Sequence, residues 1–112
     1  MKFLALICGI EGGEDVDMET LYGQYEAFDE EAGAAGVIVS GEALEPVSTA
    51  SSVRVRDGKS SITDGPYAET KEQLGGYYVL DCKDLDEALS WAAKIPSARY
   101  GTIEVRPIMV LG

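Results

Sequence analysis

The order in which strand-like and helix-like patterns follow one another constrains the fold of this chain more than any other feature. Residues 2–9 form a continuous apolar run of the length expected for a central strand, and glycines end it. Across residues 17–35, apolar side chains recur every three or four positions with acids between them, which predicts an amphipathic helix. Residues 85–95 repeat the helical pattern, and Pro96 is expected to end that helix.

Three more strand-like segments complete the pattern, at residues 37–42, 76–82 and 102–111. The resulting order of strand, helix, strand, strand, helix and strand predicts a ferredoxin-like α+β fold, with a four-stranded antiparallel sheet and two helices on one face. Pro107 cannot donate to a strand ladder, so we expect the last strand at a sheet edge or with a bulge. The face without helices would expose a large apolar patch, and a homodimer that buries it is the simplest remedy.

An inserted β-hairpin is predicted between the second and third core strands, over residues 53–62. Asp57-Gly58 is a favoured two-residue turn because both of its central positions need positive φ. With that turn, Val53 lies opposite Ile62, and the two arginines of the first strand lie on the other face.

Length and charge narrow the class of protein. A chain of 112 residues with 46% apolar side chains is expected to form one domain, residues 1–112. The net charge is −11, and residues 1–53 hold eleven acids and a single base, which would repel phosphate backbones and anionic lipids. We therefore expect no nucleic-acid and no membrane partner. The apolar start lacks a small-residue cleavage site, so we expect a cytoplasmic protein.

The sequence contains no histidine, and this excludes several chemistries. Ser-His-Asp and Cys-His catalysis both need an imidazole, and zinc ligation by Cys and His would need it too. Cys8 and Cys82 are predicted at opposite ends of neighbouring antiparallel strands, so we expect no disulfide between them. No metal and no cofactor are predicted, and no catalytic residue is assigned.

Topology predicts where a pocket would lie. The first two core strands end, the third core strand begins and the second helix ends at the same end of the sheet, where the hairpin and residues 64–72 also attach. We expect any pocket at that end of the sheet. The candidate ligand-binding residues are Glu42, Asp64, Tyr67, Glu69, Lys71 and Arg106.

Two of these candidates lie on the core strands. Glu42 is either a general base, if burial raises its pKa, or an exposed acid that follows a strand. Arg106 either binds an anionic group of a ligand through two hydrogen bonds or pairs with a strand neighbour such as Asp81.

The other candidates belong to residues 64–72. Asp64 either lines a site or accepts a backbone hydrogen bond as the first residue of a turn. Thr70 and Gln73 fit a capping box, which predicts a short helical turn. Glu69 and Lys71 either contact a ligand or form a weak ion pair on a solvated loop.

Four ordered motifs resemble the DGPF-type branch of the YCII-related family, and together they cover nearly the whole chain. They are the arginine-bearing Asp-Gly hairpin at 53–59, the segment 64–76 that opens with Asp-Gly-Pro-Tyr, Leu-Asp-Glu-Ala-Leu at 85–89 and Glu-Val-Arg-Pro at 104–107. Tyr67 stands where the branch has phenylalanine.

The resemblance implies a dimeric α+β barrel, in which two sheets pack by their open faces, and a fold similar to that of small isomerases and monooxygenases that work without metals. Better-known members carry a catalytic His and Asp pair that cannot be carried over, because histidine is missing and Ile95 stands in place of the Asp. Members of the branch are also encoded beside, or fused to, extracytoplasmic-function sigma factors.

Two functions follow as hypotheses. The first is a small-molecule-binding homodimer, with or without metal-free enzymatic activity, whose pocket we expect between the open face of the sheet and residues 64–72. The alternative is a regulatory or protein-interaction module whose partner is an extracytoplasmic-function sigma factor.

Overall fold

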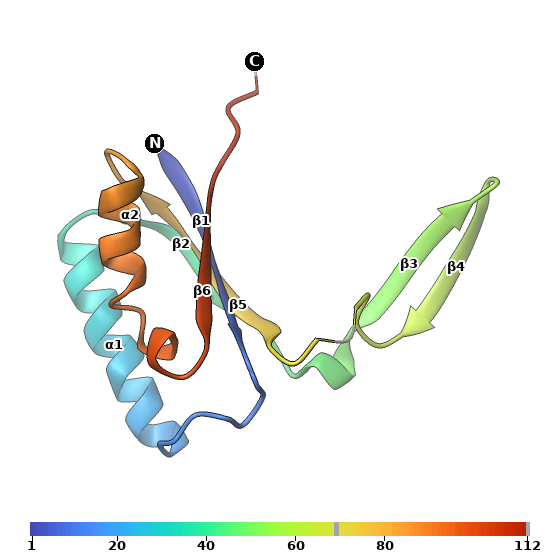
Figure 1. Ribbon diagram of the computed structural model, residues 1–112, viewed down its shortest axis with the longest axis horizontal. Helices are drawn as coiled ribbons and strands as arrows, with labels where there is room; N and C mark the ends of the chain where they lie inside the picture. Colours follow the sequence, from blue (N-terminus) through green and yellow to red (C-terminus); the bar gives the residue numbers. More distant parts are fainter. Residues whose placement is uncertain (69, 112) are drawn as a thin grey trace.

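The computed structural model describes residues 1–68 and 70–111, and it confirms the predicted α+β fold (Figure 1). Its four-stranded sheet has the order β2-β5-β1-β6 with every neighbouring pair antiparallel, which is the ferredoxin-like arrangement. The elements in chain order are β1 (Lys2–Gly9), α1 (Met18–Ala34), β2 (Ile38–Ala43), the 3-10 turn η1 (Val47–Thr49), β3 (Ser51–Arg56), β4 (Lys59–Asp64), β5 (Gln73–Asp81), α2 (Leu85–Ala92), the 3-10 turn η2 (Pro96–Arg99) and β6 (Thr102–Pro107).

Both helices pack on the same face of the sheet. On that face Phe3 of β1 lies opposite Leu80 of β5, and Ala5 lies opposite Tyr78. The ring of Phe28 in α1 packs against the ring of Tyr78, with 5.2 Å between their centroids. The two helices and the sheet thus share one core, whose buried members are Phe3, Ala5, Phe28, Ala32, Val37, Tyr78, Leu80, Cys82, Ala88, Ala92 and Ile95.

Acidic residues cap both helices at their N-termini. The Asp17 carboxylate accepts a hydrogen bond from the Thr20 backbone N–H at 2.7 Å, which satisfies a donor that has no partner within α1. The Asp84 carboxylate accepts a hydrogen bond from the Glu87 backbone N–H at 2.9 Å and caps α2 in the same way. α2 ends at Ala92, three residues earlier than predicted, and Pro96 begins η2.

The sheet face without helices is apolar, as predicted, and β6 forms one of its edges. On this open face, Leu4 lies opposite Val79 and Leu6 lies opposite Tyr77, and all four side chains are partly exposed. The last strand stops at Pro107 and does not extend to residue 111, so the apolar end of the chain leaves the sheet.

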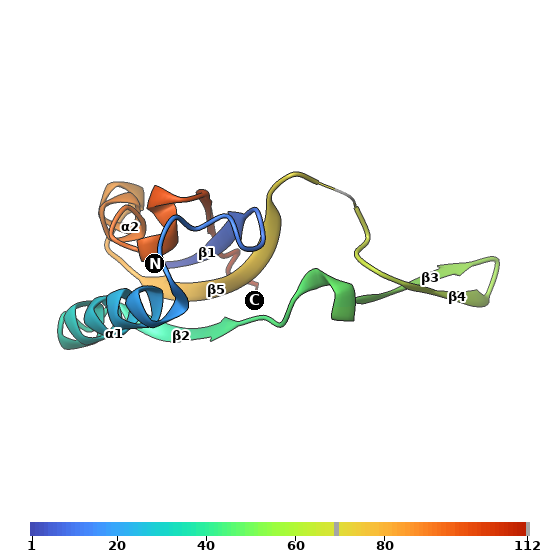
Figure 2. The ribbon, with the colours of Figure 1, turned by 90° about the horizontal axis from the view of Figure 1, so that it is seen from below.

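The predicted hairpin forms, but it does not pack on the sheet. Val53 pairs with Ile62 as predicted, and Asp57 and Gly58 at the turn have φ of 53° and 74°. Within the described residues, β3 and β4 pair with each other and with no strand of the main sheet. Figures 1 and 2 show this arm, residues 51–64, projecting away from the helices and the sheet.

The helical turn predicted from Thr70 and Gln73 is wrong. The Thr70 hydroxyl donates to the backbone carbonyl of Glu72 at 2.6 Å, and Gln73 is the first residue of β5. The strand therefore begins three residues earlier than its apolar pattern indicated. Across residues 1–68 and 70–111, no helix has both the length and the apolar character that crossing a bilayer requires.

Candidate functional site

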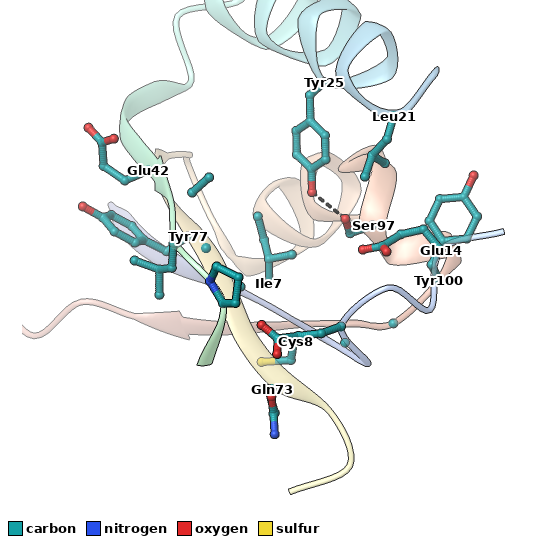
Figure 3. Close-up of a pocket in the computed structure, with 18 of the residues that line it drawn as sticks. Ile7, Cys8, Glu14, Leu21, Tyr25, Glu42, Gln73, Tyr77, Ser97 and Tyr100 are labelled. Carbon is teal, nitrogen blue, oxygen red and sulfur yellow. Dashed lines mark hydrogen bonds between the residues drawn. The ribbon is translucent and has the colours of Figure 1, made fainter. Parts of the chain in front are cut away.

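A cleft of about 730 Å³ lies at the end of the sheet where the topology predicted a pocket. β1 and β2 end there, and β5 begins there. The N-terminal half of α1, together with η2, forms the wall that faces these strands (Figure 3). The side chains of Ile7 and Tyr78, which face the helices, line it together with Leu21 and Tyr25 of α1. The cleft is therefore formed mainly on the helix side of the sheet, and not between the open face and residues 64–72 as we had expected.

Two tyrosine hydroxyls in the cleft are held by hydrogen bonds between elements. The hydroxyl of Tyr78 on β5 donates to the Asp29 carboxylate of α1 at 2.5 Å. The hydroxyl of Tyr25 on α1 lies 2.6 Å from the Ser97 hydroxyl of η2, as Figure 3 shows. These bonds fix the position of α1 over the end of the sheet. The tyrosines that line the cleft are Tyr22, Tyr25, Tyr77, Tyr78 and Tyr100.

Burial keeps both of these hydroxyls protonated. Desolvation, followed by the hydrogen bond to Asp29, raises the pKa of Tyr78 far above its usual value. Desolvation also raises the pKa of Tyr25, against a smaller lowering effect of Ser97. At neutral pH both side chains are neutral, and the Tyr78 hydroxyl donates to Asp29.

This pKa shift predicts a specific loss of stability in alkali. The folded protein holds the Tyr78 proton more tightly than the unfolded chain does. The resulting contribution to stability is complete below the unfolded pKa, about 10 for tyrosine, and is lost as the pH rises from there through the folded pKa. We expect urea unfolding to show a free energy that falls as the pH rises above about 10, with a shallower fall in Tyr78→Phe. Identical slopes in the two proteins would contradict the assigned environment of Tyr78.

The cleft is acidic. Its described lining contains four carboxylates and neither lysine nor arginine; the acids are Glu11, Glu14, Asp29 and Glu42. The Glu11 carboxylate accepts a hydrogen bond from the Val47 backbone N–H at 2.8 Å and so ties η1 to the loop after β1. The charge of this lining disfavours an anionic ligand.

The cysteines offer little nucleophilic reactivity. Cys8 lines the cleft, and desolvation together with the Glu104 and Glu72 carboxylates raises the pKa of its thiol. Cys82 follows β5 at the other end of the sheet, so the prediction that the two cysteines lie apart is confirmed. Across the described part of the chain, no group of three His, Cys, Asp or Glu residues is arranged to hold a metal ion.

The candidates from the core strands lie in different places. Glu42 lines the cleft at the end of β2, where it is exposed and sits opposite Tyr77. Arg106 lies on β6 outside the cleft lining, and its guanidinium contacts the Glu104 carboxylate at 2.7 Å. The suggested pairing with Asp81 is wrong, because Asp81 contacts the N-terminal ammonium group at 3.3 Å.

The candidates from residues 64–72 lie outside the cleft lining. Asp64 is the last residue of β4 and is exposed, and it does not open a separate turn. Tyr67 is 79% exposed, and the Arg54 guanidinium of the arm lies over its ring at 5.2 Å from the centroid. Lys71 is exposed, and Glu69 lies outside the described residues. A ligand-binding role for these four side chains stays a prediction.

The cleft residues of α1 are not among the site residues predicted from the sequence. Tyr25 and Asp29 are one turn apart and both line the cleft, whereas the sequence pattern indicates only an amphipathic helix there. A usable signal was present, because tyrosines at residues 22 and 25 place hydroxyl groups on a stripe that otherwise holds apolar side chains.

The chain belongs to the YCII-related family, because the YCII-related domain matches residues 1–111. It is 44% identical over 80 residues to the uncharacterized protein R00369 of Rhizobium meliloti (strain 1021), a match that covers 70% of this chain and 62% of that protein. The chain thus spans less than two thirds of the length of that relative.

A solved structure has the same fold. It is 5-chloro-2-hydroxyhydroquinone dehydrochlorinase (TftG) from Burkholderia phenoliruptrix AC1100, in complex with 2,5-dihydroxybenzoquinone. The similarity has a TM-score of 0.59 and covers 97% of this chain and 94% of that one, at 17% identity. At this level of identity the similarity establishes the fold.

Proposed function

We propose that this protein is a small-molecule-binding member of the DGPF-type branch, and that its ligand occupies the cleft between α1, η2 and the end of the sheet. The observation that carries the proposal is a cleft of about 730 Å³ whose walls hold five tyrosines, with two of the hydroxyls anchored by Asp29 and Ser97. This volume lies within the range of roughly 300–1,000 Å³ that small-molecule sites occupy.

The proposed ligand is a small, uncharged aromatic molecule that carries hydroxyl groups. Tyrosine rings offer flat apolar surfaces for an aromatic ring, and the carboxylates accept hydrogen bonds from hydroxyl groups. The four acids of the lining would repel a carboxylated analogue. The 2,5-dihydroxybenzoquinone in complex with TftG is likewise a small six-membered ring with oxygen substituents, which supports the proposed size of the ligand.

We further propose a homodimer in which the open sheet faces of two copies pack together, in a cytoplasmic protein. Leu4, Leu6 and Val79 form the apolar centre of that face. Glu42 and Tyr77 lie opposite each other where the open face meets the cleft. A second copy packed there would exclude water from Glu42, which is the candidate general base of any metal-free reaction at this site.

The proposal is tested with resorcinol, an uncharged dihydroxybenzene, and with β-resorcylate, which adds one carboxylate to it. We expect resorcinol at millimolar concentration to raise the melting temperature by a few degrees, because a ligand that binds the native state stabilises it by mass action. β-Resorcylate should give a clearly smaller rise.

Two variants separate binding in the cleft from binding elsewhere. Asp29→Asn removes a carboxylate that lines the cleft, and we expect it to abolish most of the effect of resorcinol. Asp64→Asn is the matched control outside the cleft lining and should respond like the wild type. An equal response of both variants, or a stronger response to β-resorcylate, would refute binding in this cleft.

A further inference from the structure

The arm, residues 51–64, is an amphipathic hairpin that stands apart from the rest of the molecule. Its register puts Val53, Val55 and Ile62 on one face, and these side chains are 65%, 58% and 75% exposed. The opposite face carries Arg54, paired across the strands with a serine, and is partly covered by the ring of Tyr67. The apolar face of the arm is therefore the uncovered one.

A hairpin in this position needs a surface to pack against. An isolated two-stranded hairpin is at best marginally stable in water, and hairpins gain stability when an apolar face is buried. Within the described residues, neither strand of the arm pairs with the main sheet. Three large apolar side chains on one face of a projecting element mark it as an interaction surface.

We propose that the apolar face of the arm packs against a second copy of this chain, so that in the dimer each arm docks on the other subunit. This inference rests on the homodimer proposed above and extends it, because it assigns the arm to the same interface as the open sheet face. In a twofold-symmetric pair, each arm would contact the other copy in an equivalent way.

The charges of the chain favour a second copy as the partner. The arm holds three bases and two acids, a net charge of +1, whereas residues 1–50 hold eleven acids and one base. The positive arm is therefore attracted to the acidic body of another copy. A second copy also offers exposed apolar side chains outside its sheet, among them Met109, Val110 and Leu111 after the end of β6.

Analytical ultracentrifugation of the full chain tests the inference. We expect the wild type to dimerise, and Val53→Ser combined with Ile62→Ser to raise the dimer dissociation constant at least about tenfold, since burial of these two side chains is lost. Ser61→Ala combined with Thr63→Ala changes the other face of the same hairpin and should leave that constant within about twofold of the wild type.

Hydrogen exchange provides a second measurement that needs no variant. Backbone amides of β3 and β4 should exchange more slowly at concentrations where the chain is dimeric than at concentrations where it is monomeric, because docking stabilises the hairpin. Exchange rates in the arm that do not depend on protein concentration would overturn the inference.

The outcomes separate this inference from the proposed function. If the wild type dimerises and the apolar-face variant dimerises equally well, the docking of the arms is wrong and the packing of sheet faces stands. If the chain is monomeric at every concentration, both the homodimer and the docking of the arms are wrong. Resorcinol binding is measured on either species and is not affected by this result.

Discussion

Phe3→Ala is expected to lower the free energy of unfolding by about 3–5 kcal/mol, the largest effect of any substitution considered for this chain. Phe3 is fully buried, lies opposite Leu80 on the helix-covered face of β1, and belongs to the single core shared by the sheet and both helices. Removing its ring would leave a cavity that the surrounding strands cannot close. Domains of this size are stable by about 5–15 kcal/mol, so the variant would be close to unfolding.

Urea unfolding of Phe3→Ala is best compared with that of Leu89→Ala. Leu89 lies on α2 and is 47% exposed, so its truncation should cost less than about 1 kcal/mol. Similar losses in the two variants would mean that the core is not organised around the helix-covered face of β1.

Gly41→Ala is expected to lower the free energy of unfolding by about 1–3 kcal/mol and to weaken the binding of resorcinol. A Cβ atom at Gly41 would lie 2.6 Å from a ring carbon of Tyr78 and 3.0 Å from the backbone oxygen of Tyr77. The Tyr78 ring packs on Phe28 and its hydroxyl is bonded to Asp29, so the ring cannot move aside without losing those contacts. The same glycine therefore supports both the sheet and the cleft.

Gly23→Ala is the matched control for Gly41→Ala. Gly23 lies inside α1, and a Cβ atom there would meet no heavy atom within 4 Å. Alanine in a helix is more favourable than glycine by roughly 0.5–1 kcal/mol, so this variant should be more stable than the wild type. Thermal or urea unfolding that shows the same direction of change at both glycines would contradict the tight contact at Gly41.

The fold could be predicted from the sequence because its signals are local. The periodic apolar positions identify α1 and α2, and Asp57-Gly58 is sufficient to specify the turn and register of the arm. The sequence-based predictions are wrong where tertiary contacts determine the extent of an element. Gln73 to Gly75 join β5 because β1 pairs with that segment, although its own composition is weakly strand-like. The projection of the arm away from the sheet has no signature in the sequence.

The site was harder to predict because it depends on how distant elements meet. Topology identified the correct end of the sheet, and Glu42 lines the cleft found there. The contribution of Tyr25 and Asp29 follows from the angle at which α1 crosses the sheet, which periodicity does not reveal. The segment 64–72 is dense in polar residues, but none of its described residues lines the cleft.

The most direct measurement of ligand binding in the cleft is a series of ¹H–¹⁵N correlation spectra recorded during titration with resorcinol. We expect saturable shifts of the backbone amides of Gly41, Gly76, Tyr78 and Gly101, which surround the cleft, and little change at Val53 and Val55 on the arm. Shifts confined to the arm, or the absence of saturable shifts around the cleft, would contradict the proposed function.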